Sequence, residues 1–295
     1  MQSALPETDR QSAAPGAAFY SRQFEAIVTG APLGRIGSLE VRIAVDEAQI
    51  AAAQQVRYRV FYEELGAKGD EVAAADQRDA DRFDAVCDHL LVYDTAIVGP
   101  ELSKIVGTYR LLRQESAVAA GGFYSNDEFD LDSLVARHPS LRFLELGRSC
   151  VLPEYRSKRT IEVLWQGIWA YINHYSVGVM TGCASFHGTT PAAHAEALSF
   201  LAQNCRPDPT WDVRAVPSRY QSMDLMPPEA VNMRSAMNAM PPLIKGYLRL
   251  GAKIGDGCVI DHEFGTTDVF IILPVSALST RYLNYYSIDA SRFAA

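Results

Sequence analysis

The chain has 295 residues, of which 48% are hydrophobic and 21% charged, and its formal net charge is -8. This length allows one large domain or two small ones, and the composition is that of an ordinary globular protein. No run of 18 or more apolar residues occurs, so the sequence predicts no helix that spans a membrane. The negative charge argues against nucleic acid as the main partner.

The five cysteines are scattered and form no Cys-x-x-Cys pair. Unclustered cysteines in odd number are typical of a reduced compartment, and we expect no metal site. The N-terminus lacks a basic region followed by an apolar stretch, so we expect no secretory signal and a cytoplasmic location. Residues 1–36 are rich in Ala, Ser, Pro, Gly and Gln, which predicts a flexible N-terminal segment with one short helix near Phe19–Val28.

Residues 37–295 are predicted to form a single domain in which strands and helices alternate. A strand over Ser38–Val45 leads to a capping box that begins at Asp46, and the helix that follows is expected to end at Gly66. The segment Lys68–Arg82 is charged and rich in alanine, which predicts a surface loop.

Hydrophobic periodicity predicts the remaining elements. Strands are expected at His89–Tyr93, Lys104–Leu112, Leu144–Val151, Val177–Phe186, Val259–His262 and Asp268–Val275. Helices are expected after a cap at Thr160, at Pro191–Asn204, from Pro242 to Leu250 and near Leu278–Tyr286. Two segments are predicted to be irregular inserts: 121–141, with a short helical piece, and 206–240.

Two charged residues, Glu145 and Arg148, lie inside the apolar strand Leu144–Val151. Charged groups in such a strand are costly unless they are paired or used. Strict alternation would point the two side chains apart, but Gly147 between them marks a bulge that would turn both to one side. The bulge would also free backbone N–H groups that stabilise an oxyanion. The alternative is a structural salt bridge at a sheet edge.

A cluster of cations, Arg156, Lys158 and Arg159, follows this strand and precedes the predicted helix cap at Thr160. Taken alone, the cluster has the composition of a solvated basic turn. The N-terminus of the helix adds oriented N–H donors to these cations, and a phosphate or pyrophosphate on a carrier would suit the combination.

The other candidates are weaker. Taken alone, Asp81, Asp84 and Arg110 are better explained as ordinary surface charge and one ion pair than as a binding site. Cys150 is a candidate nucleophile, but no histidine is placed by sequence to activate it, and a buried structural thiol is the alternative. His262 lies between two acidic residues and is compatible with simple structural hydrogen bonding.

The order strand, helix, strand, strand, bulged strand, basic turn, helix, strand resembles the GCN5-related N-acyltransferase fold. The resemblance implies an α/β (α+β) architecture: a mixed twisted sheet flanked by helices, with a bulged fourth strand and here an extended C-terminal part. In that family the pantetheine phosphate binds to the turn after the fourth strand. The turn in this chain, Arg156–Thr160, lacks the family's glycines, which points away from acetyl-CoA and toward a protein-borne acyl donor.

Further motifs narrow the resemblance. Four resemble the signature of the acyl-homoserine lactone synthases in order and spacing: Arg57-Tyr-Arg-Val-Phe61, Asp81-Arg-Phe-Asp84, Arg110-Leu-Leu112 and Glu145-Leu-Gly-Arg148. Three more resemble the bacterial L-ornithine N-alpha-acyltransferases: Gly182-Cys-Ala-Ser-Phe186, Pro241–Gly251 and Asp261–Val269. The resemblance covers roughly residues 39–285.

This resemblance implies transfer of a 3-hydroxyacyl group from the phosphopantetheine of acyl carrier protein to the alpha-amine of L-ornithine, without a permanently bound cofactor. Glu145 would be the general base and Arg148 its catalytic partner. The expected substrate-binding residues are Arg57, Phe61, Asp81, Asp84 and Arg110, with the two aspartates on the side-chain ammonium. The expected carrier-binding residues are Val151, Arg156, Lys158, Arg159 and Thr160.

The acyl chain and the lipid product add two further expectations. Trp165, Trp169, Val179 and Phe186 are candidate walls of an acyl tunnel, with plain core as the alternative. An interfacial helix with Phe19, Tyr20, Phe24 and Ile27 would give peripheral contact with the inner face of the membrane. The alternatives to ornithine acylation are another amine acceptor, such as glycine, lysine or a homoserine lactone precursor, and a non-catalytic module that binds an acylated carrier or lipid.

Overall fold

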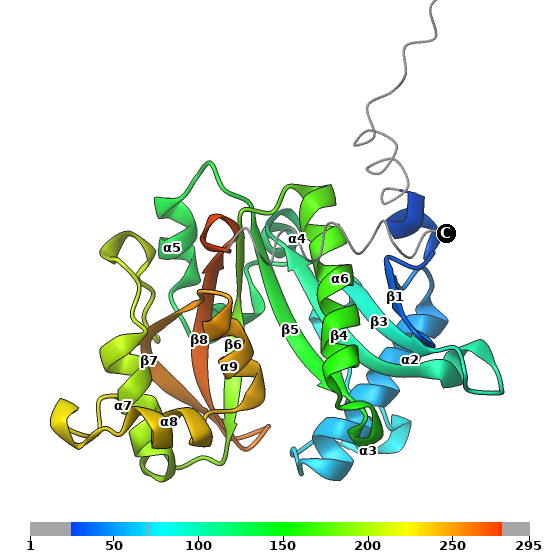
Figure 1. The fold of residues 1–295 in the computed structure, drawn as a ribbon. Helices are drawn as coiled ribbons and strands as arrows, with labels where there is room; N and C mark the ends of the chain where they lie inside the picture. Colours follow the sequence, from blue (N-terminus) through cyan, green and yellow to red (C-terminus); the bar gives the residue numbers. More distant parts are fainter. Residues whose placement is uncertain (1–24, 70, 279–295) are drawn as a thin grey trace, which may run out of the picture.

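A computed structural model describes residues 25–69 and 71–278. Eight strands form one sheet in the order β1-β2-β3-β4-β5-β6-β8-β7 (Figure 1). Only β5 and β6 pair in parallel; the other neighbours are antiparallel. The strands are β1 (Gly34–Ile36), β2 (Leu39–Ile43), β3 (Asp88–Asp94), β4 (Ile105–Arg113), β5 (Phe143–Val151), β6 (Val179–His187), β7 (Lys253–Asp261) and β8 (Thr266–Pro274).

The longer helices are α2 (Glu47–Tyr58), α3 (Glu71–Asp76), α4 (Gln114–Ala119), α5 (Leu131–Arg137), α6 (Lys158–Tyr175), α7 (Ala195–Asn204), α8 (Met233–Ala239) and α9 (Pro242–Arg249). The short or irregular ones are η1 (Arg59–Glu64), η2 (Arg82–Ala85), η3 (Glu101–Lys104), η4 (Tyr124–Asp127), η5 (Pro153–Tyr155), η6 (Pro191–His194), η7 (Pro209–Trp211), η8 (Pro228–Ala230) and η9 (Val275–Ala277). Among the helices of the described residues, none has the length and apolar character needed to cross a bilayer.

Helices α2 and α6 cover opposite faces of the β1–β5 part of the sheet (Figure 1). The predicted apolar stripe of α6 is confirmed, because Val163, Leu164 and Ile168 are buried against the sheet. At Gly167 the helix approaches so closely that a Cβ atom would lie 2.7 Å from the side chain of Val41. A larger residue there would push α6 away from the sheet.

Strands β5 and β6 are hydrogen-bonded only at their beginnings. Their pairing runs from Phe143 opposite Val179 to Glu145 opposite Thr181 and then stops. At this point Gly182 has a φ of 152°, and a Cβ atom on it would overlap the carbonyl oxygen of Leu146. The strands therefore diverge just beyond Glu145, and the side chain of Glu145 lies at the apex of the V that they form.

The predicted bulge in the β5 strand is confirmed, one position later than expected. Tyr109 of β4 lies opposite two residues of β5, Arg148 and Ser149, because the register shifts between Thr108 and Arg110. Arg148 has a φ of 50°, which is rare for a residue with a side chain and is typical of strained positions at functional sites. The bulge turns Arg148 toward the same cavity that Glu145 lines.

Several expectations for the N-terminal half need correction. The Asp46 cap is confirmed by a bond of 2.8 Å from the Gln49 amide, but α2 continues as the π-helix η1 instead of as a regular helix. The predicted surface loop Lys68–Arg82 contains α3 and the buried Asp79. The sheet begins at β1, before the predicted domain start at residue 37.

The cap of α6 and the C-terminal elements also differ from the prediction. Ser157 caps α6 through the Thr160 amide; Thr160 itself is buried, and its hydroxyl donates to a backbone carbonyl. Strand β7 begins at Lys253, earlier than expected, since Gly255 and Gly257 interrupt its apolar pattern. The helix predicted near Leu278–Tyr286 lies almost wholly outside the described residues.

Candidate active site

A cavity of about 270 Å³ lies between the diverging ends of β5 and β6. Strand alternation faces Glu145, Cys183 and Ser185 toward it, and Asp268 of β8 lies opposite Ser185 on the same face. The described lining is polar near the sheet and apolar toward η1 and α9, where it includes Phe61, Leu65, Leu243 and Phe264. The cavity thus joins a site for charged groups to a region suited to an acyl chain.

Glu145 is held at the apex by the η4 turn. Its side chain is 3% exposed, and its carboxylate accepts the backbone N–H groups of Tyr124 at 2.7 Å and Ser125 at 2.9 Å, with the Ser125 hydroxyl as a third donor. Burial raises the pKa of Glu145, although these hydrogen bonds oppose the rise. Oε1 accepts two of the three bonds and Oε2 one, so Oε2 retains an acceptor position.

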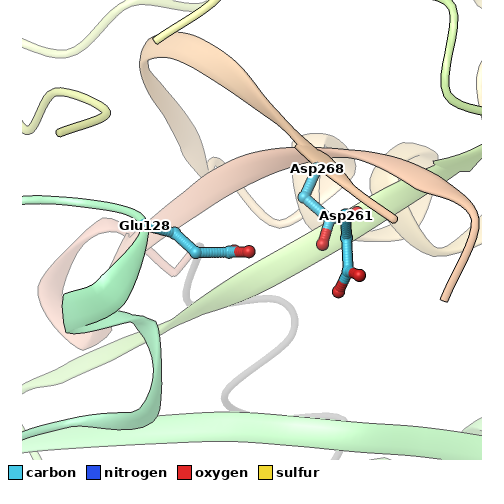
Figure 2. Close-up of side chains that lie close together, drawn as sticks. All are labelled: Glu128, Asp261 and Asp268. Atoms are coloured by element: carbon cyan, nitrogen blue, oxygen red, sulfur yellow. The ribbon is translucent and has the colours of Figure 1, made fainter. Parts of the chain in front are cut away.

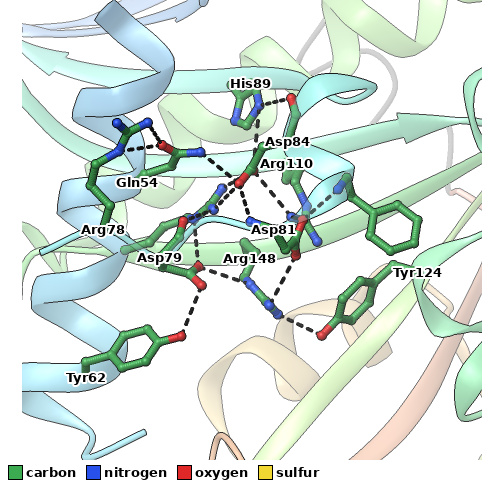
Figure 3. A network of polar contacts seen from close by, with 12 residues as sticks. Gln54, Tyr62, Arg78, Asp79, Asp81, Asp84, His89, Arg110, Tyr124 and Arg148 are labelled. Carbon is green, nitrogen blue, oxygen red and sulfur yellow. Dashed lines mark hydrogen bonds and ion pairs between the residues drawn. The ribbon is translucent and has the colours of Figure 1, made fainter. Parts of the chain in front are cut away.

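Three guanidinium groups and three carboxylates form a buried network beside Glu145 (Figure 3). We call it the arginine-paired cluster; it consists of Arg57, Arg110, Arg148, Asp79, Asp81 and Asp84. Arg57 is 0% exposed and binds Asp79 at 2.8 Å and Asp84 at 2.7 Å. Arg110 binds Asp81 at 2.7 Å, and Arg148 joins Asp79 at 3.1 Å to Asp81 at 3.4 Å.

The arginine-paired cluster has equal numbers of positive and negative groups. Burial opposes ionisation of Asp84, but the guanidinium of Arg57 outweighs it and lowers the pKa of this carboxyl. Asp84 also caps its own turn and accepts a bond from Gln54 at 2.9 Å. The cluster fixes Arg148 so that its guanidinium lies over the rings of Tyr124 and Phe264, which both line the cavity.

A second group of carboxylates faces the cavity from three separate segments (Figure 2). We call it the open cluster; it consists of Glu128 after η4, Asp261 at the end of β7 and Asp268 in β8. One carboxylate oxygen from each lies within 4.8 Å of the others. Arg219 binds Glu128 at 3.0 Å and is the ion-pair partner that the described residues provide for this cluster. Burial raises the pKa of Glu128 to about 7 and that of Asp268 to about 6.

The three cations of the basic turn after β5 are all exposed. Arg156 makes two bonds of 2.6 Å to Glu64 of η1. Lys158 is 89% exposed and lies 3.4 Å from Glu162, and Arg159 is also exposed. The first-turn N–H groups of α6 lie at the same place, so the turn can receive an anion.

Comparisons with known proteins identify the family. The sequence model of the acetyltransferase (GNAT) domain matches residues 56–166. An L-ornithine N(alpha)-acyltransferase of Brucella abortus (strain 2308) is 62% identical, covering 94% of this chain and 97% of the relative. The enzyme of that name from Agrobacterium fabrum (strain C58 / ATCC 33970) is 59% identical, covering 88% of each.

The chain belongs to the L-ornithine N(alpha)-acyltransferase family. It is a GNAT acyltransferase, which confirms the fold and the enzyme class expected from its motifs. A solved N-acyl amino acid synthase from uncultured soil microbes aligns with a TM-score of 0.46 at 11% identity, covering 81% of this chain and 91% of the synthase.

Most of the residues predicted for this acyltransferase site lie together. Glu145, Arg148, Arg110 and Phe61 line the cavity. Arg57 and Asp84 lie behind it in the arginine-paired cluster, where their charged groups already bind one another. The basic turn is separate from the cavity lining. Cys150 is buried, and burial raises its pKa to about 12, so it is not activated as a nucleophile.

The predictions for the acyl tunnel and for the interfacial helix agree less well with the structure. Val179 and Phe186 are core residues, and neither they nor Trp165 and Trp169 belong to the cavity lining. Ile27 is 5% exposed and packs in the core, so it is unavailable for the expected interfacial face; Phe19, Tyr20 and Phe24 lie outside the described residues.

Sequence reasoning missed several residues of this acyltransferase site. Tyr124 and Ser125 lie in a segment predicted to be irregular, and only their contacts with Glu145 reveal their role. The open cluster was missed because its members are distant in sequence. A usable signal existed in Asp268, an acidic residue directly before the long apolar run of strand β8.

Proposed function

We propose that the protein transfers a 3-hydroxyacyl group from acyl carrier protein to the alpha-amine of L-ornithine, which is the first step of ornithine lipid synthesis. The observation that carries the proposal is the placement of Glu145. It is a buried carboxylate at the apex of two parted strands, in a cavity that combines acidic groups with an apolar end. A thioester inserted between the strands would meet an acceptor amine there.

Glu145 would accept the proton that the amine loses. An alpha-ammonium group cannot attack a thioester, and a carboxylate with a raised pKa is the better base near neutral pH. The remaining acceptor position on Oε2 would take this proton directly or through a water. The amine nitrogen then bonds to the thioester carbon, and the pantetheine thiol leaves with a proton. No covalent enzyme intermediate is needed.

The bulged strand would stabilise the tetrahedral intermediate. Beyond Glu145 the β6-facing edge of β5 pairs with no strand of the described residues. N–H groups of this edge near Val151 would bind the oxyanion. Arg148 and Arg110 would add positive potential, and Arg148 is the better placed of the two to bind the acceptor's carboxylate, since it is less buried.

The carrier would dock at the basic turn. Lys158 and Arg159 are exposed beside the N-terminus of α6, and they would bind the phosphopantetheine phosphate and the acidic surface of the carrier. Arg156 would orient this turn through Glu64. The side chain of Thr160 would act indirectly, by holding the turn through its bond to the Tyr155 carbonyl.

The acyl chain would occupy the apolar end of the cavity. Leu65 and Leu243 line this end and are 43% and 40% exposed, so a long chain would emerge between η1 and α9. An opening with exposed apolar side chains would also suit peripheral contact with the cytoplasmic face of a membrane, where the lipid product is released.

The decisive experiment supplies two donors and a panel of acceptors. The purified protein is mixed with 3-hydroxyacyl carrier protein or 3-hydroxyacyl-CoA, and with ornithine, lysine, glycine or S-adenosylmethionine. Mass spectrometry then identifies the acylated amine. We expect acylation of the ornithine alpha-amine with the carrier as the better donor. Acylation of another acceptor in preference to ornithine, or of none, would contradict the proposal.

A further inference from the structure

Within the described residues, the open cluster has more carboxylates than cationic partners. It consists of Glu128, Asp261 and Asp268, and the ion pair found there joins Arg219 to Glu128. The arginine-paired cluster, by contrast, has one guanidinium for each carboxylate. Two of the three carboxyls of the open cluster are buried, and unbalanced buried carboxylates are costly. The geometry therefore leaves room for a cation from outside the protein.

Asp268 provides a second and independent sign of a ligand. It is only 6% exposed, it lines the cavity, and its Oδ1 atom has no hydrogen-bond partner in the part of the chain that the structure describes. The hydroxyl groups of Ser185 and Thr266 lie close enough to Asp268 to oppose the rise in its pKa, but neither makes a hydrogen bond of normal geometry to Oδ1. Buried polar atoms are nearly always hydrogen-bonded, so an unpartnered acceptor that faces a cavity indicates a donor supplied by a bound molecule.

The spacing suits an ammonium group. An ammonium has three N–H donors, one for each carboxylate of the cluster. Three oxygens placed around its nitrogen at hydrogen-bond distance of about 2.8 Å are separated from one another by about 4.6 Å. One oxygen from each carboxylate lies within 4.8 Å of the others, so a single ammonium can reach all three.

The open cluster is connected to Glu145 through two side chains. The Ser125 hydroxyl donates to Glu145, and its oxygen lies 3.3 Å from the sulfur of Cys183. The same sulfur lies 3.3 Å from Glu128 Oε2. A small amino acid in this cavity can therefore present one amine to Glu145 and a second amine to the open cluster.

We propose that Glu128, Asp261 and Asp268 bind the side-chain ammonium of the acceptor and so select a diamino acid. This inference rests on the proposed function, because it assigns the acceptor's second amine to a subsite. It also transfers that role away from Asp81 and Asp84, whose charges are already balanced by arginines. Cys183 would separate the two amines as a neutral spacer, since burial raises its pKa well above the ordinary value.

The test compares ornithine with norvaline, which has the same carbon chain and lacks the second amine. We expect the wild-type protein to prefer ornithine in kcat/KM by on the order of 10²-fold, since buried hydrogen bonds to charged groups discriminate strongly. Asp268→Asn and Asp261→Asn should reduce this ratio to below about tenfold. Asp127→Asn is the matched control, because Asp127 is exposed beside Glu128 and does not line the cavity; its ratio should equal that of the wild type.

Two outcomes would overturn the subsite. One is an unchanged ratio in both cluster variants when thermal melting shows that they are folded. The other is loss of ornithine acylation in EDTA with recovery on addition of Mg²⁺ or Mn²⁺, which would make the cluster a metal site. If the wild-type protein acylates neither amino acid, the proposed function itself fails. If it acylates ornithine and norvaline equally, only the subsite fails.

Discussion

Two groups of three carboxylates lie on either side of Glu145, and their charge balance differs. In the arginine-paired cluster each carboxylate has a guanidinium partner within the protein, and the pKa of Asp84 is lowered. In the open cluster the ion pair that the described residues provide joins Arg219 to Glu128, and the pKa values of Glu128 and Asp268 are raised to about 7 and about 6. Residue type alone does not distinguish the two groups, but their partners do.

The difference separates a structural role from a ligand-binding one. A carboxylate whose pKa is lowered by its neighbours stabilises the fold when it is charged. A carboxylate whose pKa is raised by burial destabilises the fold when it is charged, and a site that retains such groups needs a ligand to compensate. The arginine-paired cluster therefore holds Arg148 and Arg110 in place, and the open cluster remains available to a cation.

Glu145 lies between the clusters and offers the largest expected effect. Glu145→Gln keeps the shape of the side chain and removes the base, so kcat should fall by on the order of 10²–10⁴. Binding of ornithine, measured by calorimetry without acyl donor, should stay within a few-fold of the wild type, since both clusters are intact. Near-normal turnover of the folded variant would show that Glu145 is not the base.

The arginine-paired cluster should be the more important of the two for stability. Arg57→Met replaces a fully buried guanidinium and leaves Asp79 and Asp84 without their main partner. The free energy of unfolding should fall by about 3–5 kcal/mol, which is typical when one member of a buried ion pair is removed. Urea denaturation measures this change. A loss below about 1 kcal/mol would show that the cluster is not a structural unit.

In the open cluster, removal of a charge should raise the free energy of unfolding instead of lowering it. The folded-state pKa of Asp268 is about 6, above its usual 3.8, so its ionisation opposes folding; this cost is absent below pH 3.8 and complete above pH 6. Asp268→Asn should therefore raise the free energy of unfolding at pH 8 by about 1–3 kcal/mol, and the gain should disappear near pH 4. Urea denaturation at both pH values tests this, with Asp127→Asn as the control.

The sequence was sufficient for those parts of the site that local patterns encode. Glu145 and Arg148 were identifiable because two charges in one apolar strand demand a partner or a use. Their common orientation followed from the idea of a bulge, although the actual bulge is at Arg148 and Ser149, opposite Tyr109, beyond the glycine that suggested it. A glycine permits a bulge, but the pairing with the neighbouring strand decides its position.

The parts of the site that could not be predicted from the sequence depend on contacts between distant segments. The pairing of Asp81 and Asp84 with arginines, which balances their charges within the protein, involves α2, η2, β4 and the bulge. The open cluster forms only because β6, β8 and β7 are neighbours in the sheet and because Glu128 follows η4. No local period encodes these arrangements, since charge balance is a property of the folded chain.

The smallest expected effect concerns the affinity for the acyl donor. Charge reversal at the basic turn tests whether this turn, and not the two clusters, binds the acylated carrier. Lys158 and Arg159 are exposed, so salt screens their contribution to carrier binding. In the double variant Lys158→Glu, Arg159→Glu, the KM for the acylated carrier should rise by roughly 3–10-fold. The KM for ornithine should not change, because neither residue lines the cavity. Lys253→Glu, an exposed charge reversal at the start of β7, is the control. If both charge-reversal variants raise the carrier KM equally, only the net charge of the protein matters. If the ornithine KM rises instead, the acceptor lies nearer to the basic turn than the open cluster requires.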